Sequence, residues 1–250
     1  MAGERNFDEI FARNMLVPAI GRAGQEKLLA ARVLVVGAGG LGSPVSLYLA
    51  AAGVGVIGLA DADVVERSNL QRQILYGLGD TGRKKTDAAR ERLESLNGRT
   101  RVEVHPLRLD EKNAAALVRD YDLVVDCTDS IAARYVLNEA CFLLKKPLVH
   151  GGVLGMAGQL MTVLPGRSAC FRCAFPDPAL AAAADGAAVF GVLGAVAGVV
   201  GSLQACEAVK IILGRTNNLL TDRILLIDCL RLRMRAAPVA RRPDCPACAC

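Results

Sequence analysis

The stretch Arg32-Val-Leu-Val-Val-Gly37-Ala-Gly-Gly-Leu-Gly42 decides the fold class. Its apolar run ends in glycine and is typical of a buried parallel strand. Residues 41–52 then predict a helix. The glycines between them, which are Gly37, Gly39, Gly40 and Gly42, allow a tight turn and let backbone amides at a helix N-terminus approach a phosphate. The stretch therefore predicts the strand–turn–helix of a nucleotide-binding fold.

Outward from this stretch, short apolar runs alternate with segments of helical periodicity. We expect strands at 56–61, 102–105, 121–127 and 147–153, and helices at 83–97, 111–119 and 131–144. The first thirty residues predict helices interrupted near Pro18 and Gly21. This alternation predicts an α/β fold, a doubly wound Rossmann-like and mostly parallel sheet with helices on both faces.

The pattern changes after Gly155. We expect a strand at 159–164, a mobile Ala-rich loop at 175–189, a long helix to about Gly214, and strands at 223–228 and 230–235. The last strands would form an antiparallel extension of the sheet. We interpret residues 1–250 as a single domain, made of N-terminal helices (1–30), a nucleotide-binding half (31–155) and a C-terminal extension (156–250).

Composition excludes several classes of protein. The net charge is +5, and no Lys/Arg run lies beside aromatics, so the sequence does not favour nucleic acid. Charged residues between Glu4 and Glu9 argue against a signal peptide, so we expect a cytoplasmic protein. The uncharged segment 186–206 is long enough for a membrane span, but its Ala, Gly and Val content favours a buried or subunit-contacting helix.

Polar residues follow the expected strands where the carboxyl ends of a doubly wound sheet converge. Asp61 ends the second strand and can accept bonds from ribose hydroxyls, which alone would suggest a nicotinamide dehydrogenase. The stretch Ser68-Asn-Leu-Gln-Arg-Gln73, then Lys85 and Asp129, do not fit that class. They would instead bring amide donors, two cations and a candidate metal-binding carboxylate into one crevice.

Nine cysteines without a leader favour a reducing compartment and metal binding rather than disulfides. Four of them form two C-x-x-C pairs, Cys170/Cys173 and Cys245/Cys248. Two such thiolate pairs can complete a closed tetrahedral zinc site, which would be structural and would staple the tail to the domain.

Together these pieces resemble the ThiF/MoeB/HesA family, the prokaryotic relatives of ubiquitin-activating enzymes. The resemblance runs from Arg13 to Cys248. It rests on VLVVGAGGLGSP (33–44), LADAD (59–63), SNLQRQ (68–73), the lysine near KKTDAAR (84–90), DLVVDCTDS (122–130), GSLQACEAVK (201–210) and both C-x-x-C pairs.

The resemblance implies an enzyme that uses ATP and Mg²⁺ to adenylate the C-terminal carboxylate of a small ubiquitin-like protein of the MoaD or ThiS type. It implies a nucleotide site formed by Gly37, Gly39, Gly40, Gly42, Asp61, Ser68, Asn69, Leu70, Gln71, Arg72, Gln73, Lys85, Asp129 and Ser130. Within it, Asp129 would bind magnesium, and Asn69, Arg72 and Lys85 would contact the triphosphate. Arg13 would reach across a homodimer into the partner's site.

One feature departs from the family pattern. Several relatives carry a cysteine in the loop before the Gly-rich helix, where this chain has Ala187. We therefore expect no covalent cysteine intermediate, and transfer of the adenylate to a separate sulfur donor. Two other hypotheses stay open at this point, a nicotinamide oxidoreductase and a catalytically silent scaffold that binds a ubiquitin-like protein.

Overall fold

The computed structural model describes residues 2–177 and 191–248. Its helices are α1 (Ala2–Met15), α2 (Gly21–Ala30), α3 (Gly42–Ala51), α4 (Lys85–Glu94), α5 (Ala114–Arg119), α6 (Ile131–Leu143), α7 (Phe171–Ala174) and α9 (Gly194–Ile212). Its strands are β1 (Arg32–Val36), β2 (Val56–Ala60), β3 (Arg101–His105), β4 (Leu123–Asp126), β5 (Leu148–Leu154), β6 (Ala157–Val163), β7 (Arg223–Asp228) and β8 (Arg233–Pro238). The expected mobile loop at 175–189 and Ala187 fall mainly or wholly outside the described residues.

One eight-stranded sheet runs in the order β3-β2-β1-β4-β5-β6-β7-β8. The first five of these strands are parallel, and β6, β7 and β8 continue the sheet antiparallel. This confirms the predicted fold class. Because β1 lies between β2 and β4, the chain reverses direction across the sheet there, and a crevice opens beyond the carboxyl ends of these strands.

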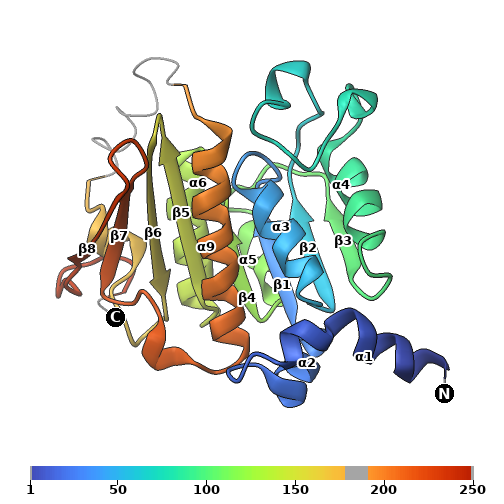
Figure 1. Cartoon of the computed structure of the whole chain (residues 1–250). Coiled ribbons are helices and arrows are strands. Elements are labelled where there is room, and N and C mark those ends of the chain that lie inside the picture. The colour runs from blue at the N-terminus through green and yellow to red at the C-terminus, as the bar shows by residue number, and fades with distance from the viewer. Residues whose placement is uncertain (1, 178–190, 249–250) are drawn as a thin grey trace.

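Helices cover both faces of the sheet, with α3 and α9 in front of it and α5 and α6 behind it in Figure 1. The alternation along β1 explains the two cores. Val33 and Val35 pack into the cluster under α3 and α9, whereas Leu34 and Val36 pack into the cluster under α5 and α6. Side chains of a strand alternate between faces, so an unbroken apolar run requires cover on both sides.

Helix α9 is the described helix that is long and apolar enough to cross a membrane. It packs against α3, β5 and β6. Glycine permits this close approach, because a Cβ at Gly201 would lie 2.5 Å from the Pro44 ring and one at Gly158 would lie 2.4 Å from Val200. Gly201 therefore lies in the contact between α9 and α3, whereas a Cβ at Gly198 would meet no described atom within 4 Å.

The last predicted strand, at 230–235, is wrong by three residues. The structure starts β8 at Arg233, because residues 229–232 form the turn after β7. The Asp228 carboxylate accepts a hydrogen bond from the Arg231 amide at 3.0 Å, and Leu232 has a φ of 52°. The hydrophobic pattern of the sequence does not reveal this turn, because the turn is held by hydrogen bonds to the carboxylate of Asp228.

Candidate nucleotide site and metal centre

The glycine turn joins β1 to α3 at the carboxyl edge of the sheet. Gly37 has a φ of +96°, and a Cβ there would lie 2.6 Å from the carbonyl oxygen of Cys127. A Cβ at Gly42 would lie 1.9 Å from the Gly37 carbonyl oxygen. These two positions therefore require glycine for the turn itself. Gly39 and Gly40 line the cavity beside it, where their bare backbone is open to a ligand.

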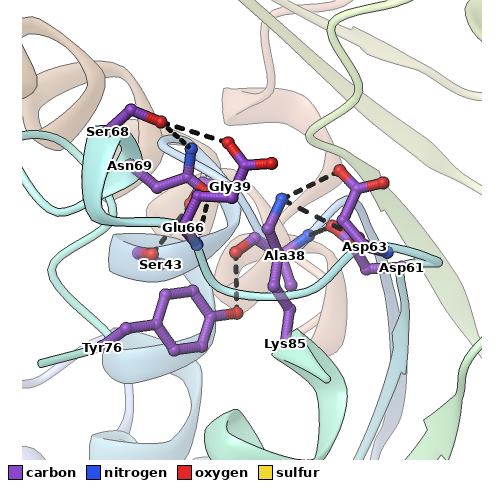
Figure 2. Close-up of polar contacts among 10 residues, drawn as sticks. All are labelled: Ala38, Gly39, Ser43, Asp61, Asp63, Glu66, Ser68, Asn69, Tyr76 and Lys85. Atoms are coloured by element: carbon purple, nitrogen blue, oxygen red, sulfur yellow. Dashed lines mark hydrogen bonds and ion pairs between the residues drawn. The ribbon is translucent and has the colours of Figure 1, made fainter. Parts of the chain in front are cut away.

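Side chains from three elements hold this turn in place (Figure 2). The Ala38 amide donates to the Asp61 carboxylate at 2.8 Å, and the Tyr76 hydroxyl donates to the Ala38 carbonyl at 2.9 Å. The Ser43 hydroxyl donates to the Gly39 carbonyl at 2.8 Å. Burial, together with the charge of Asp61, raises the pKa of Tyr76, so its hydroxyl keeps the proton it donates. The turn is thus fixed before any ligand binds.

Asp61 lies where the sequence predicts it, directly after β2 and in the cavity wall. One carboxylate oxygen accepts the Ala38 amide and the other accepts the Asp63 amide at 2.9 Å. Each carboxylate oxygen has a second lone pair, so two further donors can still bind. The two neighbouring hydroxyl groups of a ribose could supply these two donors, and the ribose contact stays a prediction.

Lys85 opens α4 and is nearly buried in the same wall. Its Nζ lies 3.0 Å from Asp63 and 4.0 Å from Asp61, and its amide donates to the Asp63 carbonyl at 3.0 Å. Figure 2 shows both carboxylates facing the ammonium group. A buried cation without a partner would be costly, and the two carboxylates supply Lys85 with partners in the cavity wall.

The segment 68–73 divides into two parts. Gln71, Arg72 and Gln73 line the cavity, whereas Ser68, Asn69 and Leu70 do not. Asn69 instead closes a 3₁₀ turn, where its side chain accepts from the Glu66 amide and donates to Ser68, both at 3.4 Å (Figure 2). The structure therefore brings together only the second half of the predicted motif.

Gln73 carries an observation that points to a ligand. Its side chain is 4% exposed, and its amide oxygen has no hydrogen-bond partner in the described chain. The side chain lies beside Gly39, because a Cβ there would be 3.5 Å from Gln73 Nε2. Buried polar atoms are almost always paired, so an unpaired one in a cavity wall fits a site completed by a bound group.

Asp129 and Ser130 follow β4 and line the opposite wall of the cavity. Asp129 is exposed, and the Ser130 hydroxyl caps α6 by accepting from the Ala133 amide at 3.4 Å. Arg134, from the first turns of α6, donates to the Thr128 carbonyl at 2.8 Å. An exposed carboxylate on a turn fixed in this way is the kind of oxygen ligand that Mg²⁺ takes alongside phosphates.

The cavity has a volume of about 1720 Å³. Pockets for small ligands hold about 300–1,000 Å³, so a nucleotide would leave a large part of it free. The cavity is also lined by the sheet extension, including Gln159 on β6 and Arg233 and Arg235 on β8. Nothing in the local sequence pattern distinguishes these residues from ordinary strand residues, so they were not among the predicted site residues.

Arg13 lies elsewhere. It is exposed on α1, and it does not line the cavity of its own chain. Figure 1 places α1 at the end of the sheet away from the glycine turn. Any contact between Arg13 and a nucleotide would therefore involve the site of another copy.

The four cysteines of the two C-x-x-C pairs form one buried cluster, with all sulfur atoms within 4.8 Å of one another. The sulfur–sulfur distances include 3.9 Å for Cys170–Cys173, 3.7 Å for Cys170–Cys245 and 3.4 Å for Cys173–Cys248. A tetrahedron with zinc–sulfur bonds of about 2.3 Å has edges of about 3.8 Å. The donor set and its spacing therefore fit zinc with only small movements.

Burial raises the pKa of Cys170 to about 11, so this thiol stays protonated in the absence of a cation. Zinc binds thiolates, so metal binding would displace that proton. The Arg242 amide lies 3.5 Å from the Cys173 sulfur and supplies a donor to it. None of the four cysteines lines the cavity described above, so a metal here would be structural.

A doubly wound sheet with a glycine turn, a ribose-compatible carboxylate and cations at its carboxyl edge defines a Rossmann-like nucleotide-binding protein. The chain belongs to the ThiF family, whose profile matches residues 11–247. It is 45% identical over 243 residues to the sulfur carrier protein adenylyltransferase of Thermus thermophilus, covering 95% of this chain and 89% of that protein. It is 46% identical over 239 residues to the adenylyltransferase and sulfurtransferase MOCS3 of Culex quinquefasciatus, covering 95% of this chain.

This chain spans only 54% of the Culex protein, and about half of other MOCS3 relatives. Among solved structures, Escherichia coli MccB with ATP has a TM-score of 0.81 and 25% identity, covering 90% of this chain and 68% of that one. MccB with MccA-N7isoASN has a TM-score of 0.88 and 24% identity, covering 97% and 75%. This second likeness shows the fold alone.

Proposed function

We propose that this protein uses ATP to adenylate the C-terminal carboxylate of a small ubiquitin-like sulfur carrier ending in Gly-Gly, the MoaD-like or ThiS-like type. The observation that carries the proposal is the convergence of the glycine turn, Arg72, Lys85 and Asp129 on one cavity. The name of the Thermus relative supports the class of acceptor. The free volume beyond a nucleotide supports an extended peptide as the second substrate.

The chemistry needs little beyond what these residues offer. An acceptor carboxylate is already ionised at neutral pH, so it attacks the α-phosphorus without a general base. A carboxylate oxygen–phosphorus bond forms, the bond from the α-phosphorus to the bridging oxygen breaks, and pyrophosphate leaves. Arg72, Lys85 and the turn amides offset the repulsion between the two anions and the charge on the leaving group. A magnesium ion held by Asp129 would neutralise further phosphate charge.

The remaining features belong to the same proposal. The protein would be a cytoplasmic single-domain homodimer in which Arg13 completes the partner's site, and zinc would staple the C-terminal tail. With alanine at position 187, the acyl-adenylate would pass to a separate sulfur donor rather than to a cysteine of this chain. A silent scaffold for a ubiquitin-like protein is the second candidate, and the retained cations of the cavity favour the enzyme over it.

ATP–pyrophosphate exchange tests this function. We expect exchange that depends on an added Gly-Gly-ending carrier from the same genome. Arg72→Ala and Asp129→Ala should lower it by about 100-fold or more while folding is retained, because each removes charge stabilisation in the transition state. Arg13→Ala should have a comparable effect although Arg13 lies outside its own cavity.

Arg90→Ala and Asp87→Ala are matched controls, because both residues lie on α4 outside the cavity and should leave exchange unchanged. If wild-type protein showed no exchange with any Gly-Gly-ending carrier from the same genome, the scaffold would be favoured over the enzyme. Near-normal exchange in the Arg72 or Asp129 variant would refute the role assigned to that residue.

A further inference from the structure

A chain of three polar side chains runs from the cavity wall into the sheet and has no part in the chemistry proposed above. It consists of Asp126 at the end of β4, His150 on β5 and Gln159 on β6. Asp126 and His150 are 1% and 0% exposed, so neither can contact a ligand directly. Burying a carboxylate and an imidazole is costly unless both are fully paired, so their arrangement requires a reason.

Asp126 is joined to the turn that carries Asp129. One oxygen of its carboxylate accepts the Thr128 amide at 3.0 Å and the Thr128 hydroxyl at 2.7 Å. The other oxygen lies 2.8 Å from His150 Nδ1. Burial opposes ionisation of Asp126, yet the His150 hydrogen bond and the charge of Arg134 hold its pKa below the ordinary value. The turn is therefore held by an ionised carboxylate, and His150 stabilises that charge.

The protonation of His150 follows from its two partners. Burial lowers its pKa, so the ring is neutral near pH 7, and a neutral ring facing a carboxylate donates from Nδ1. Nε2 is then an acceptor, and Gln159 Nε2 lies 3.4 Å from it. Gln159 reaches back over Gly152, where a Cβ would lie 3.1 Å from the Gln159 amide nitrogen. Gln159 also lines the cavity.

The third neighbour of His150 is an aromatic ring close to the cysteine cluster. The Phe171 ring, next to Cys170, packs on the imidazole with 4.6 Å between ring centroids. His150 is therefore fixed from three sides, by β4, by β6 and by the start of α7.

We propose that His150 is a positioning residue that holds Asp126, and through it the Thr128–Asp129 turn, in the geometry that binds magnesium with ATP. The proposal rests on the magnesium role of Asp129. His150 would not touch the metal or the nucleotide, and its effect would be transmitted by the Asp126 carboxylate. Hydrogen-bond partners one step removed from a metal ligand set its affinity by orienting it.

The test is binding, which requires neither turnover nor a carrier protein. Isothermal titration calorimetry on the full chain would measure ATP affinity with Mg²⁺ and, separately, in EDTA. His150→Ala should weaken Mg²⁺–ATP binding about 10-fold or more, while ATP binding in EDTA changes little. A general loosening of the fold would weaken both equally, so the ratio of the two affinities reports the positioning role.

Two conservative variants identify the hydrogen bond concerned. The Asn amide can occupy the place of Nδ1, so His150→Asn should recover most of the lost Mg²⁺ dependence, and His150→Gln should not. Met161→Ala is the matched control, because Met161 is the cross-strand neighbour of His150 and is equally buried. It should lower the melting temperature without altering the Mg²⁺ dependence.

An unchanged Mg²⁺ dependence in His150→Ala would overturn the proposal, as would an equal change in Met161→Ala or the absence of recovery in His150→Asn. Wild-type ATP affinity that does not depend on Mg²⁺ would overturn it as well. These outcomes are separate from the proposed function, whose failure would appear as absent exchange while Mg²⁺-dependent ATP binding persists.

Discussion

Tyr76→Phe removes one hydroxyl from beneath the glycine turn and changes nothing else in the side chain. That hydroxyl is the hydrogen-bond donor to the Ala38 carbonyl, and Ala38 is 0% exposed. After the substitution, no water can easily reach the carbonyl in its present position. The oxygen would remain unpaired, or the turn would move until it is solvated.

The magnitude follows from this geometry. Leaving a buried carbonyl without its partner costs about 1–3 kcal/mol. In a chain of this size 1 kcal/mol shifts the melting temperature by about 2–4 °C, so we expect a fall of about 2–12 °C. The hydrogen bond already exists without ligand, so folding bears most of this cost. ATP affinity should fall only if the turn, freed from this hydrogen bond, changes its conformation. We expect that loss of affinity to be about tenfold or less.

Thermal unfolding and ATP titration of the same preparations would measure both effects. Tyr135→Phe is the matched control, because its hydroxyl donates to the Phe175 carbonyl at 2.6 Å, away from the glycine turn. It should lower the melting temperature and leave ATP affinity unchanged. The reasoning would be refuted if Tyr76→Phe melted like wild-type protein, or if both variants lost ATP affinity equally.

Two further predictions concern the metal cluster and pH. Cys245→Ser should reduce bound zinc from one per chain to well below one and lower the melting temperature, and elemental analysis showing full occupancy would contradict the assigned ligand set. Burial lowers the pKa of His150, so its stabilising contribution is complete above the unfolded value of about 6.5 and is lost as pH falls, by up to about 1.4 kcal/mol per pH unit. Urea unfolding would measure the free energy of unfolding between pH 7.5 and 5. This free energy should depend less steeply on pH in His150→Asn than in wild-type protein, and equal pH dependence would rule this contribution out.

The parallel strands were predictable because burial on both faces demands apolar residues at every position, as in β1 and β4. The start of β8 was not, since both faces of that edge strand are largely exposed and its residues carry no alternation. The turn before β8 depends on hydrogen bonds to Asp228, and a hydropathy pattern does not show these bonds.

The same difference explains the site. Gly37, Asp61 and Asp129 were predictable because strand ends converge in a doubly wound sheet, and motif positions follow from that topology. Tyr76 and His150 were not, because their roles depend on partners 38 and 24 residues away in the chain. The residues next to His150 in the sequence do not include Asp126 or Gln159, so its hydrogen-bond partners could not be inferred from them.

The cavity has two walls whose rigidity has different origins. The wall that contains the glycine turn is fixed by the parallel sheet and by side chains that form hydrogen bonds to the turn. The other wall consists of β6, β7 and β8, and β8 is the largely exposed edge strand of the sheet. The cysteine pairs lie just after β6 and beyond β8, so a metal ion between them would tie the two ends of this extension together. Although none of the four cysteines lines the cavity, a zinc ion held by them would therefore fix this wall.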